Sequence, residues 1–180
     1  MSLSRSQLTN IGRVSDIPQP CAVVVPSQRM SDRRGSDDDI ARLLRTTVWA
    51  IVGLTPNPRR PAYGVGRFLL DQDITVIPVN PLGAAVHDQR AVRILGEIDV
   101  SVDVVDIFRR SSDAGAHVDE AIAIGAGAVW LQLGVIDTAA ADQAEAAGLT
   151  VVMDHCPAIE WSRPGRGLLA DCAATAAGRS

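Results

Sequence analysis

The chain has 180 residues, of which 47% are apolar and 21% charged, and its net charge is −4. This is an ordinary globular composition, and the net charge argues against a strongly basic nucleic-acid-binding protein. The sequence contains no apolar run of about 20 residues, which argues against a membrane span. The N-terminus lacks the apolar core of a secretory signal. The spacing of Cys21, Cys156 and Cys172 suits neither a disulfide framework nor a zinc site. We therefore expect a cytoplasmic protein.

Both ends of the chain are predicted to lie outside the folded domain. Residues 1–36 are rich in Ser, Arg, Gln and Pro, which favours a disordered extension, although the apolar patch at 21–25 also suits an added edge strand. Residues 164–180 are rich in Gly, Ala and Arg, and we expect a flexible tail there. The folded domain is therefore expected over residues 37–163.

Between these ends, strand-like and helix-like patterns alternate. Helices are expected at 37–44 with Ser36 as its cap, at 63–71, at 112–124 capped by Ser112 or Asp113, and at 137–147. Strands are expected at 48–52, 74–79, 102–108, 128–133 and 149–153. This order predicts an α/β fold in a single domain, with a doubly wound parallel sheet of about five strands and right-handed crossovers.

In such a sheet, ligands bind beyond the C-terminal ends of the strands, so the residues after each strand are the candidate site. The first strand is followed by Gly53 and a Pro-rich loop with Thr55, Pro56 and Arg59, and a helix follows near Tyr63. Glycine lets the backbone approach an anion, and the free N–H groups of a helix start attract negative charge. The segment therefore favours a phosphate-binding loop over a surface turn with solvated arginines.

The next two strand ends narrow the class of nucleotide. Asn80 and Pro81 follow the second strand, where an NAD site usually has an acidic residue that binds the ribose hydroxyls. Its absence argues against NAD and permits NADP or coenzyme A, whose ribose carries a phosphate. Phe108, Arg109 and Arg110 follow the third strand, where the arginines would either pair with phosphate or remain as exposed charge.

The last two strand ends carry the remaining candidates. Gln132 and Gly134 follow the fourth strand, and Gln132 would bond either to a ligand or to backbone. After the fifth strand, Cys156 lies beside His155, a pair that could supply a nucleophile and its base. Neighbours in an extended chain point to opposite sides, however, and the spacing does not suit a metal. We therefore expect a structural or binding role here, with neither catalysis nor a metal.

Five segments, taken in order, resemble the small bacterial CoA-binding proteins: V-G-L-T-P-N-P-x-R-P-A-Y, V-I-P-V-N-P, V-D-V-V-D-I-F-R-R, A-V-W-L-Q-L-G-V and G-L-T-V-V-M-D-x-C. These proteins are stand-alone Rossmann-like domains, similar to the N-terminal CoA-binding domain of the succinyl-CoA synthetase alpha subunit. The resemblance covers residues 40–163 and implies non-catalytic binding of coenzyme A or an acyl-CoA. The phosphorylated histidine of the synthetase lies in a second domain, so ligase activity is not carried over.

The resemblance also implies which residues contact CoA. It matches Gly53, Thr55, Pro56, Arg59, Tyr63, Asn80, Pro81, Phe108, Arg109, Trp130, Gln132, Gly134, Asp154, Cys156 and Glu160. The family often has a basic residue where this chain has His155. Two alternatives stay open, an NADP-linked oxidoreductase or redox sensor and a nucleotide-sensing regulatory subunit of an acyl-CoA enzyme. The chain contains no Lys and hence no Tyr–Lys pair of a reductase. The expected partner is a small CoA ligand rather than nucleic acid or membrane, with a homodimer or an enzyme partner left open.

Overall fold

The computed structural model describes residues 34–163, so most of the predicted extension and all of the predicted tail lie outside the described residues. A five-stranded parallel sheet with the order β2-β1-β3-β4-β5 forms the centre of the domain. The strands are β1 (Val48–Val52), β2 (Thr75–Val79), β3 (Val104–Ile107), β4 (Ala128–Leu131) and β5 (Thr150–Met153). The sheet grows outward in both directions from β1 and β3, which confirms the predicted α/β, Rossmann-like, doubly wound single domain.

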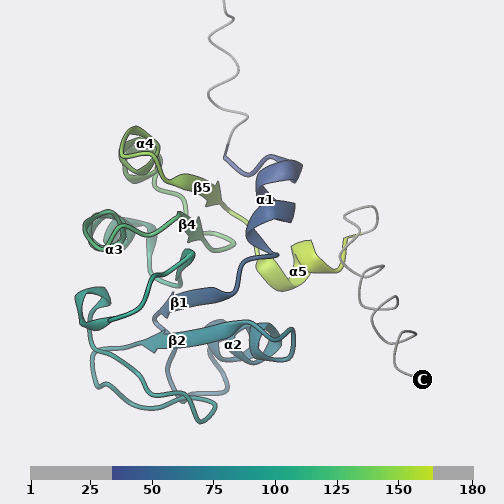
Figure 1. Cartoon of the computed structure of the whole chain (residues 1–180), viewed down its shortest axis with the longest axis vertical. Helices are drawn as coiled ribbons and strands as arrows, with labels where there is room; N and C mark the ends of the chain where they lie inside the picture. The colour runs from purple at the N-terminus through teal and green to yellow at the C-terminus, as the bar shows by residue number, and fades with distance from the viewer. Residues whose placement is uncertain (1–33, 164–180) are drawn as a thin grey trace, which may run out of the picture.

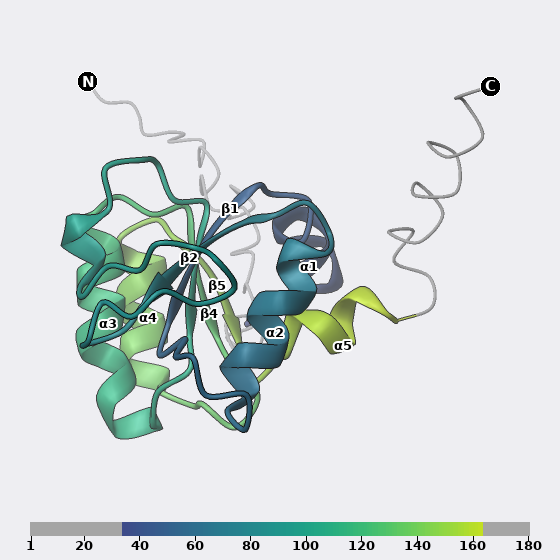
Figure 2. The same ribbon diagram turned by 90° about the horizontal axis from the view of Figure 1, so that it is seen from below.

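Helices cover both faces of the sheet (Figures 1 and 2). One face carries α1 (Asp37–Leu43), α2 (Pro61–Leu70) and α5 (Pro157–Trp161), and the other carries α3 (Ser111–Ala123) and α4 (Thr138–Ala146). A single 3-10 turn, η2 (Leu95–Glu97), interrupts the long connection from β2 to β3. None of the helices in the described part of the chain is long and apolar enough to cross a membrane.

Alternation along the buried strands divides the core into two layers. In β1, Trp49 and Ile51 join the cluster under α1 and α2, whereas Ala50 and Val52 join the cluster under α3 and α4. Trp49 packs on Trp130 of β4 with the ring centroids 5.5 Å apart. Because successive strand residues point to opposite faces, this alternation also decides which side chains reach the site at the strand ends.

Several element boundaries differ from the sequence-based expectation: α2 and β3, for example, each begin two residues away from the expected position, and three further differences lie nearer the strand ends. The fourth strand ends at Leu131 rather than 133, because the Val135 N–H donates to the Gln132 carbonyl at 2.7 Å and turns the chain. Helix α3 begins at Ser111, with Arg110 as its N-cap and no side-chain capping bond, so Ser112 and Asp113 are not its caps. Helix α5 was not predicted, because it is only five residues long, although Pro157 and Glu160 in its first turn are signals of a helix start.

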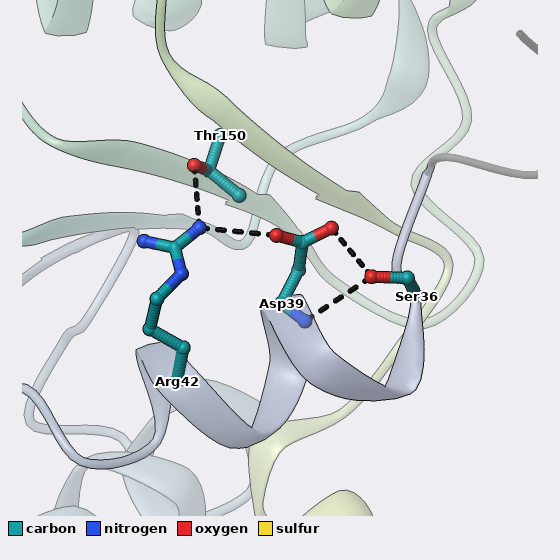
Figure 3. A network of polar contacts seen from close by, with 4 residues as sticks. All are labelled: Ser36, Asp39, Arg42 and Thr150. Atoms are coloured by element: carbon teal, nitrogen blue, oxygen red, sulfur yellow. Dashed lines mark hydrogen bonds and ion pairs between the residues drawn. The ribbon is translucent and has the colours of Figure 1, made fainter.

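The acidic first turn of α1, residues 37–39, has a structural role (Figure 3). The Ser36 hydroxyl accepts from the Asp39 backbone N–H at 3.1 Å, which caps the helix as predicted. Arg42 lies 3.0 Å from the Asp39 carboxylate and donates to Thr150 Oγ1 at 2.9 Å, which ties α1 to β5. Carboxylates suit the positive end of a helix, and no cluster with metal-ligand character occurs within residues 34–163.

Candidate ligand-binding site

A cavity of about 560 Å³ lies at the C-terminal ends of β1, β3 and β4, between the start of α2 and α5. This is where a doubly wound sheet is expected to bind a ligand. Its walls are mostly apolar, and two arginines, Arg60 and Arg109, are among the lining residues. The lining residues are Gly53, Thr55, Asn57, Arg60, Pro61, Ala62, Val65, Pro81, Phe108, Arg109, Gln132, Leu133, Val135, Cys156 and Ile159.

Gly53 makes the tight turn that opens the cavity after β1. Its φ is +91°, and a Cβ at this position would lie 2.9 Å from the Phe108 carbonyl oxygen. Both the positive φ and the close approach of two strand ends require glycine here. Gly53 and Thr55, two of the predicted contact residues, both line the cavity.

The arginine of the first loop that reaches the cavity is Arg60 rather than Arg59. Arg60 is the N-cap residue of α2, and it also lines an adjoining hollow of about 290 Å³ with Phe108, Arg109, Arg110 and Asp113. Among the described residues, none of these arginines forms an ion pair with a carboxylate. The two spaces share Arg60, Phe108 and Arg109, so a cationic hollow opens onto an apolar cavity.

Asn80 lies at the predicted strand end but does not line the cavity. Its side chain is 2% exposed and donates to the carbonyls of Leu54 at 3.0 Å and Ala84 at 2.9 Å, while its Oδ1 accepts from the Ala84 N–H at 2.9 Å. Both amide protons and the amide oxygen are therefore engaged by backbone. Asn80 fastens the loops after β1 and β2 to each other, which positions the walls of the cavity.

Replacing Asn80 with Ala is expected to lower the free energy of unfolding by about 2–3 kcal/mol, because two carbonyls and one N–H would lose their buried partner. Urea denaturation measures the loss. The matched control is Asn57→Ala, since Asn57 is exposed and its side chain accepts one bond, from the Arg59 N–H at 3.0 Å. A loss for Asn80→Ala no larger than that of the control would contradict the role assigned to Asn80.

Several predicted contact residues lie elsewhere in the described structure. Tyr63 packs against His87, with the rings tilted by 48° and their centroids 4.2 Å apart, and Pro56 and Arg59 are exposed in the loop. Gly134 adopts a φ of +82° and its N–H donates to the Asp154 carboxylate at 2.7 Å, which holds the turn after β4. None of these residues lines the cavity.

Most of the apolar wall was not predicted from the sequence. Pro61, Ala62 and Val65 contribute it from the first turns of α2, and Ile159 contributes it from α5. Pro61 could have been recognised in the sequence as a helix start, because proline favours the first position of a helix. The predicted start of α2 would then have been residue 61 rather than 63. The wall from α5 depended on a helix too short to predict.

The residues that follow β5 have two different roles. Cys156 lines the cavity as the N-cap residue of α5. His155 instead faces α5, where its Nδ1 lies 2.9 Å from Oε1 of the buried Glu160, whose Oε2 lies 3.4 Å from Arg163. The Trp130 Nε1–H donates to the His155 carbonyl at 2.8 Å. His155, Glu160 and Trp130 therefore hold α5 against the sheet rather than lining the cavity.

A buried carboxyl lies beneath the cavity. Asp106, the third residue of β3, is 0% exposed, and the Gln132 Nε2 lies 2.8 and 2.9 Å from its two carboxyl oxygens. Burial raises the pKa of Asp106 to about 8, because the charged form is desolvated, while the hydrogen bonds from Gln132 and the Ile107 backbone oppose this increase. Gln132 is itself 4% exposed and lines the cavity.

Comparison with known proteins gives the family. Residues 47–162 match the family described as a CoA binding domain. The chain belongs to this CoA-binding family. The uncharacterized protein YneT of Bacillus subtilis (strain 168) is 34% identical over 114 residues, which cover 63% of this chain and 84% of YneT.

Solved structures of relatives share the fold. A hypothetical protein from Pyrococcus horikoshii OT3 is 33% identical with a TM-score of 0.69, and the match covers 72% of this chain and 92% of that one. A Thermus thermophilus protein is 33% identical with a TM-score of 0.66, and the match covers 70% and 96% of the two chains. The predicted membership of the CoA-binding family is thus confirmed.

Proposed function

We propose that this chain binds coenzyme A or an acyl-CoA in the cavity at the strand ends and catalyses no reaction on it. Family membership supports a CoA-type ligand. The observation that carries the proposal is the joining of two unlike spaces, a hollow surrounded by Arg60, Arg109 and Arg110 and a mostly apolar cavity. Phosphates pair with arginine, whereas an uncharged chain suits apolar walls.

Coenzyme A has both kinds of group in one molecule. Its diphosphate and its ribose 3′-phosphate are anionic, and its pantetheine arm is uncharged and ends in a thiol. Arg60 and Arg109 are exposed and belong to both spaces, so they are placed to bind phosphate at the mouth while the arm enters the cavity. Asp113 also lines the hollow, and its carboxylate repels a phosphate group that comes close to it.

The arrangement around Cys156 supports binding without catalysis. A cysteine nucleophile needs a base within hydrogen-bond reach. The neighbouring His155 is held 2.9 Å from the Glu160 carboxylate, and none of the cavity-lining residues is a histidine. The cavity therefore offers a thiol without a base that would activate it.

Parallel calorimetric titrations with CoA, acetyl-CoA, dephospho-CoA and NADP test this function. We expect CoA or acetyl-CoA to bind, dephospho-CoA to bind about tenfold more weakly because one charge-assisted contact is lost, and acetyl-CoA to be recovered intact. Binding of NADP alone would overturn the proposal and favour an oxidoreductase or redox sensor. Release of free thiol from acetyl-CoA would overturn its non-catalytic part.

A further inference from the structure

Asp106 is an unusual residue for the place it occupies. It lies in the central part of the sheet, in register with Ile51 of β1 and Trp130 of β4, neither of which can ionise. Burying a carboxyl group is unfavourable, and an apolar side chain of similar size would fill the same space at no such cost. The fold alone gives no reason for a carboxyl group here, so its one side-chain partner, Gln132, is the place to look for its role.

Asp106 controls which end of the Gln132 amide is available to the cavity. Above its pKa, Asp106 is a carboxylate, which only accepts hydrogen bonds, and both of its oxygens lie within 2.9 Å of the Gln132 Nε2. This fixes the donor end of the amide against β3. Gln132 lines the cavity, so its Oε1, an acceptor, is the polar side-chain atom left for a ligand.

Gln132 differs from the arginines of the same cavity in its burial. Arg60 and Arg109 are exposed, whereas Gln132 is 4% exposed and lines the cavity together with apolar residues such as Val135. A ligand whose phosphates are held by the arginines extends its uncharged arm away from them. The end of that arm is a donor, S–H, in free CoA, and carries an acceptor, the thioester carbonyl, in an acyl-CoA.

We propose that ionised Asp106 is a positioning residue that holds Gln132 as a hydrogen-bond acceptor at the cavity floor, so that the site selects free CoA over acyl-CoA. This inference rests on the proposed function and decides between the two ligands that the function leaves open. Free CoA donates its thiol proton to Oε1. A thioester carbonyl would meet another carbonyl oxygen there, and sites built for one hydrogen-bonding polarity discriminate against the other.

The test compares the Kd of CoA, acetyl-CoA and adenosine 3′,5′-bisphosphate, which lacks the arm, for wild type, Asp106→Asn and Gln132→Met. Titrations are run at pH 8.5, where a carboxyl group with a pKa of about 8 is mostly ionised. We expect wild type to prefer CoA over acetyl-CoA by about tenfold. The side-chain amide introduced by Asp106→Asn can donate as well as accept, so it no longer fixes the orientation of the Gln132 amide. Gln132→Met removes the Gln132 amide and keeps a side chain of similar size. Both variants should bind the two CoA forms within about twofold of each other, with the bisphosphate Kd unchanged.

Three results would overturn the inference. The first is a wild type that does not prefer CoA, and the second is a preference that survives in both variants. The third is an equal loss of affinity for the bisphosphate, which would assign Asp106 and Gln132 a structural role instead. Thermal unfolding of each variant verifies that it is folded. A wild type that binds the bisphosphate and neither form of CoA would show that the proposed function itself has failed.

Discussion

Replacing Arg60 and Arg109 together with Ala is expected to weaken CoA binding by about two orders of magnitude. Hydrogen bonds to a charged partner contribute about 1.5–3 kcal/mol each, which corresponds to at least tenfold per arginine. Both side chains line the cavity and the adjoining hollow, so each is placed to reach a phosphate. Calorimetric titration with CoA measures the effect, and the loss should shrink as salt screens the charges.

The matched control for this experiment is Arg59→Ala. Arg59 precedes Arg60 in the same exposed loop and carries the same charge, but it does not line either space. We expect it to change the Kd less than about threefold, since only its long-range field is lost. A larger effect of Arg59→Ala than of the double variant would show that Arg59 binds a phosphate, as the resemblance to CoA-binding proteins implies.

Replacing Asp106 with Asn is expected to stabilise the protein increasingly as the pH rises from about 4 to about 8. The pKa of Asp106 is about 8 in the folded state, against 3.8 for an ordinary Asp. Between these values the folded protein retains a proton that the unfolded chain has released. Folding stability of the wild type therefore falls with rising pH in this window and levels off above it. The asparagine side chain does not titrate, so the variant escapes this loss.

The difference in unfolding free energy between the variant and wild type should reach a few kcal/mol at pH 9 and be small at pH 5, since each unit of pKa difference contributes about 1.4 kcal/mol. Urea denaturation of both proteins at pH 5, 7 and 9 measures it. Taking the difference cancels every other group that titrates in both proteins. A constant difference across this range would show that the folded Asp106 carboxyl titrates as it does in an unfolded chain.

The order of elements could be predicted because it depends on local patterns. Short apolar runs such as Val48–Val52, followed by turns with glycine or proline, indicate strands. The segments between these runs suit crossover connections between parallel strands. Gly53 could be placed at the site for the same reason, because a turn of this kind needs positive φ. Helix α5 could not be predicted, because five residues carry too little periodic signal.

The direction of individual side chains could not be predicted. Arg59 and Arg60 are adjacent and chemically identical, and only the start of α2 decides which one lines the cavity. Asn80 follows a strand as a ligand-binding residue would, yet two loop carbonyls and a loop N–H occupy its whole hydrogen-bonding capacity. Asp106 looks like an ordinary polar residue in the sequence, and its burial beside Gln132 requires β4 to pair with β3.

The sequence by itself therefore determined the parallel α/β sheet, the strand ends as the location of the candidate site and the resemblance to CoA-binding proteins, because these depend on patterns within short segments. The tertiary structure decided which side chains meet there. Pairing of β3 with β4 set the Asp106–Gln132 contact, and docking of α2 and α5 built the apolar wall. Contacts between distant segments depend on register and helix docking, which no local pattern encodes.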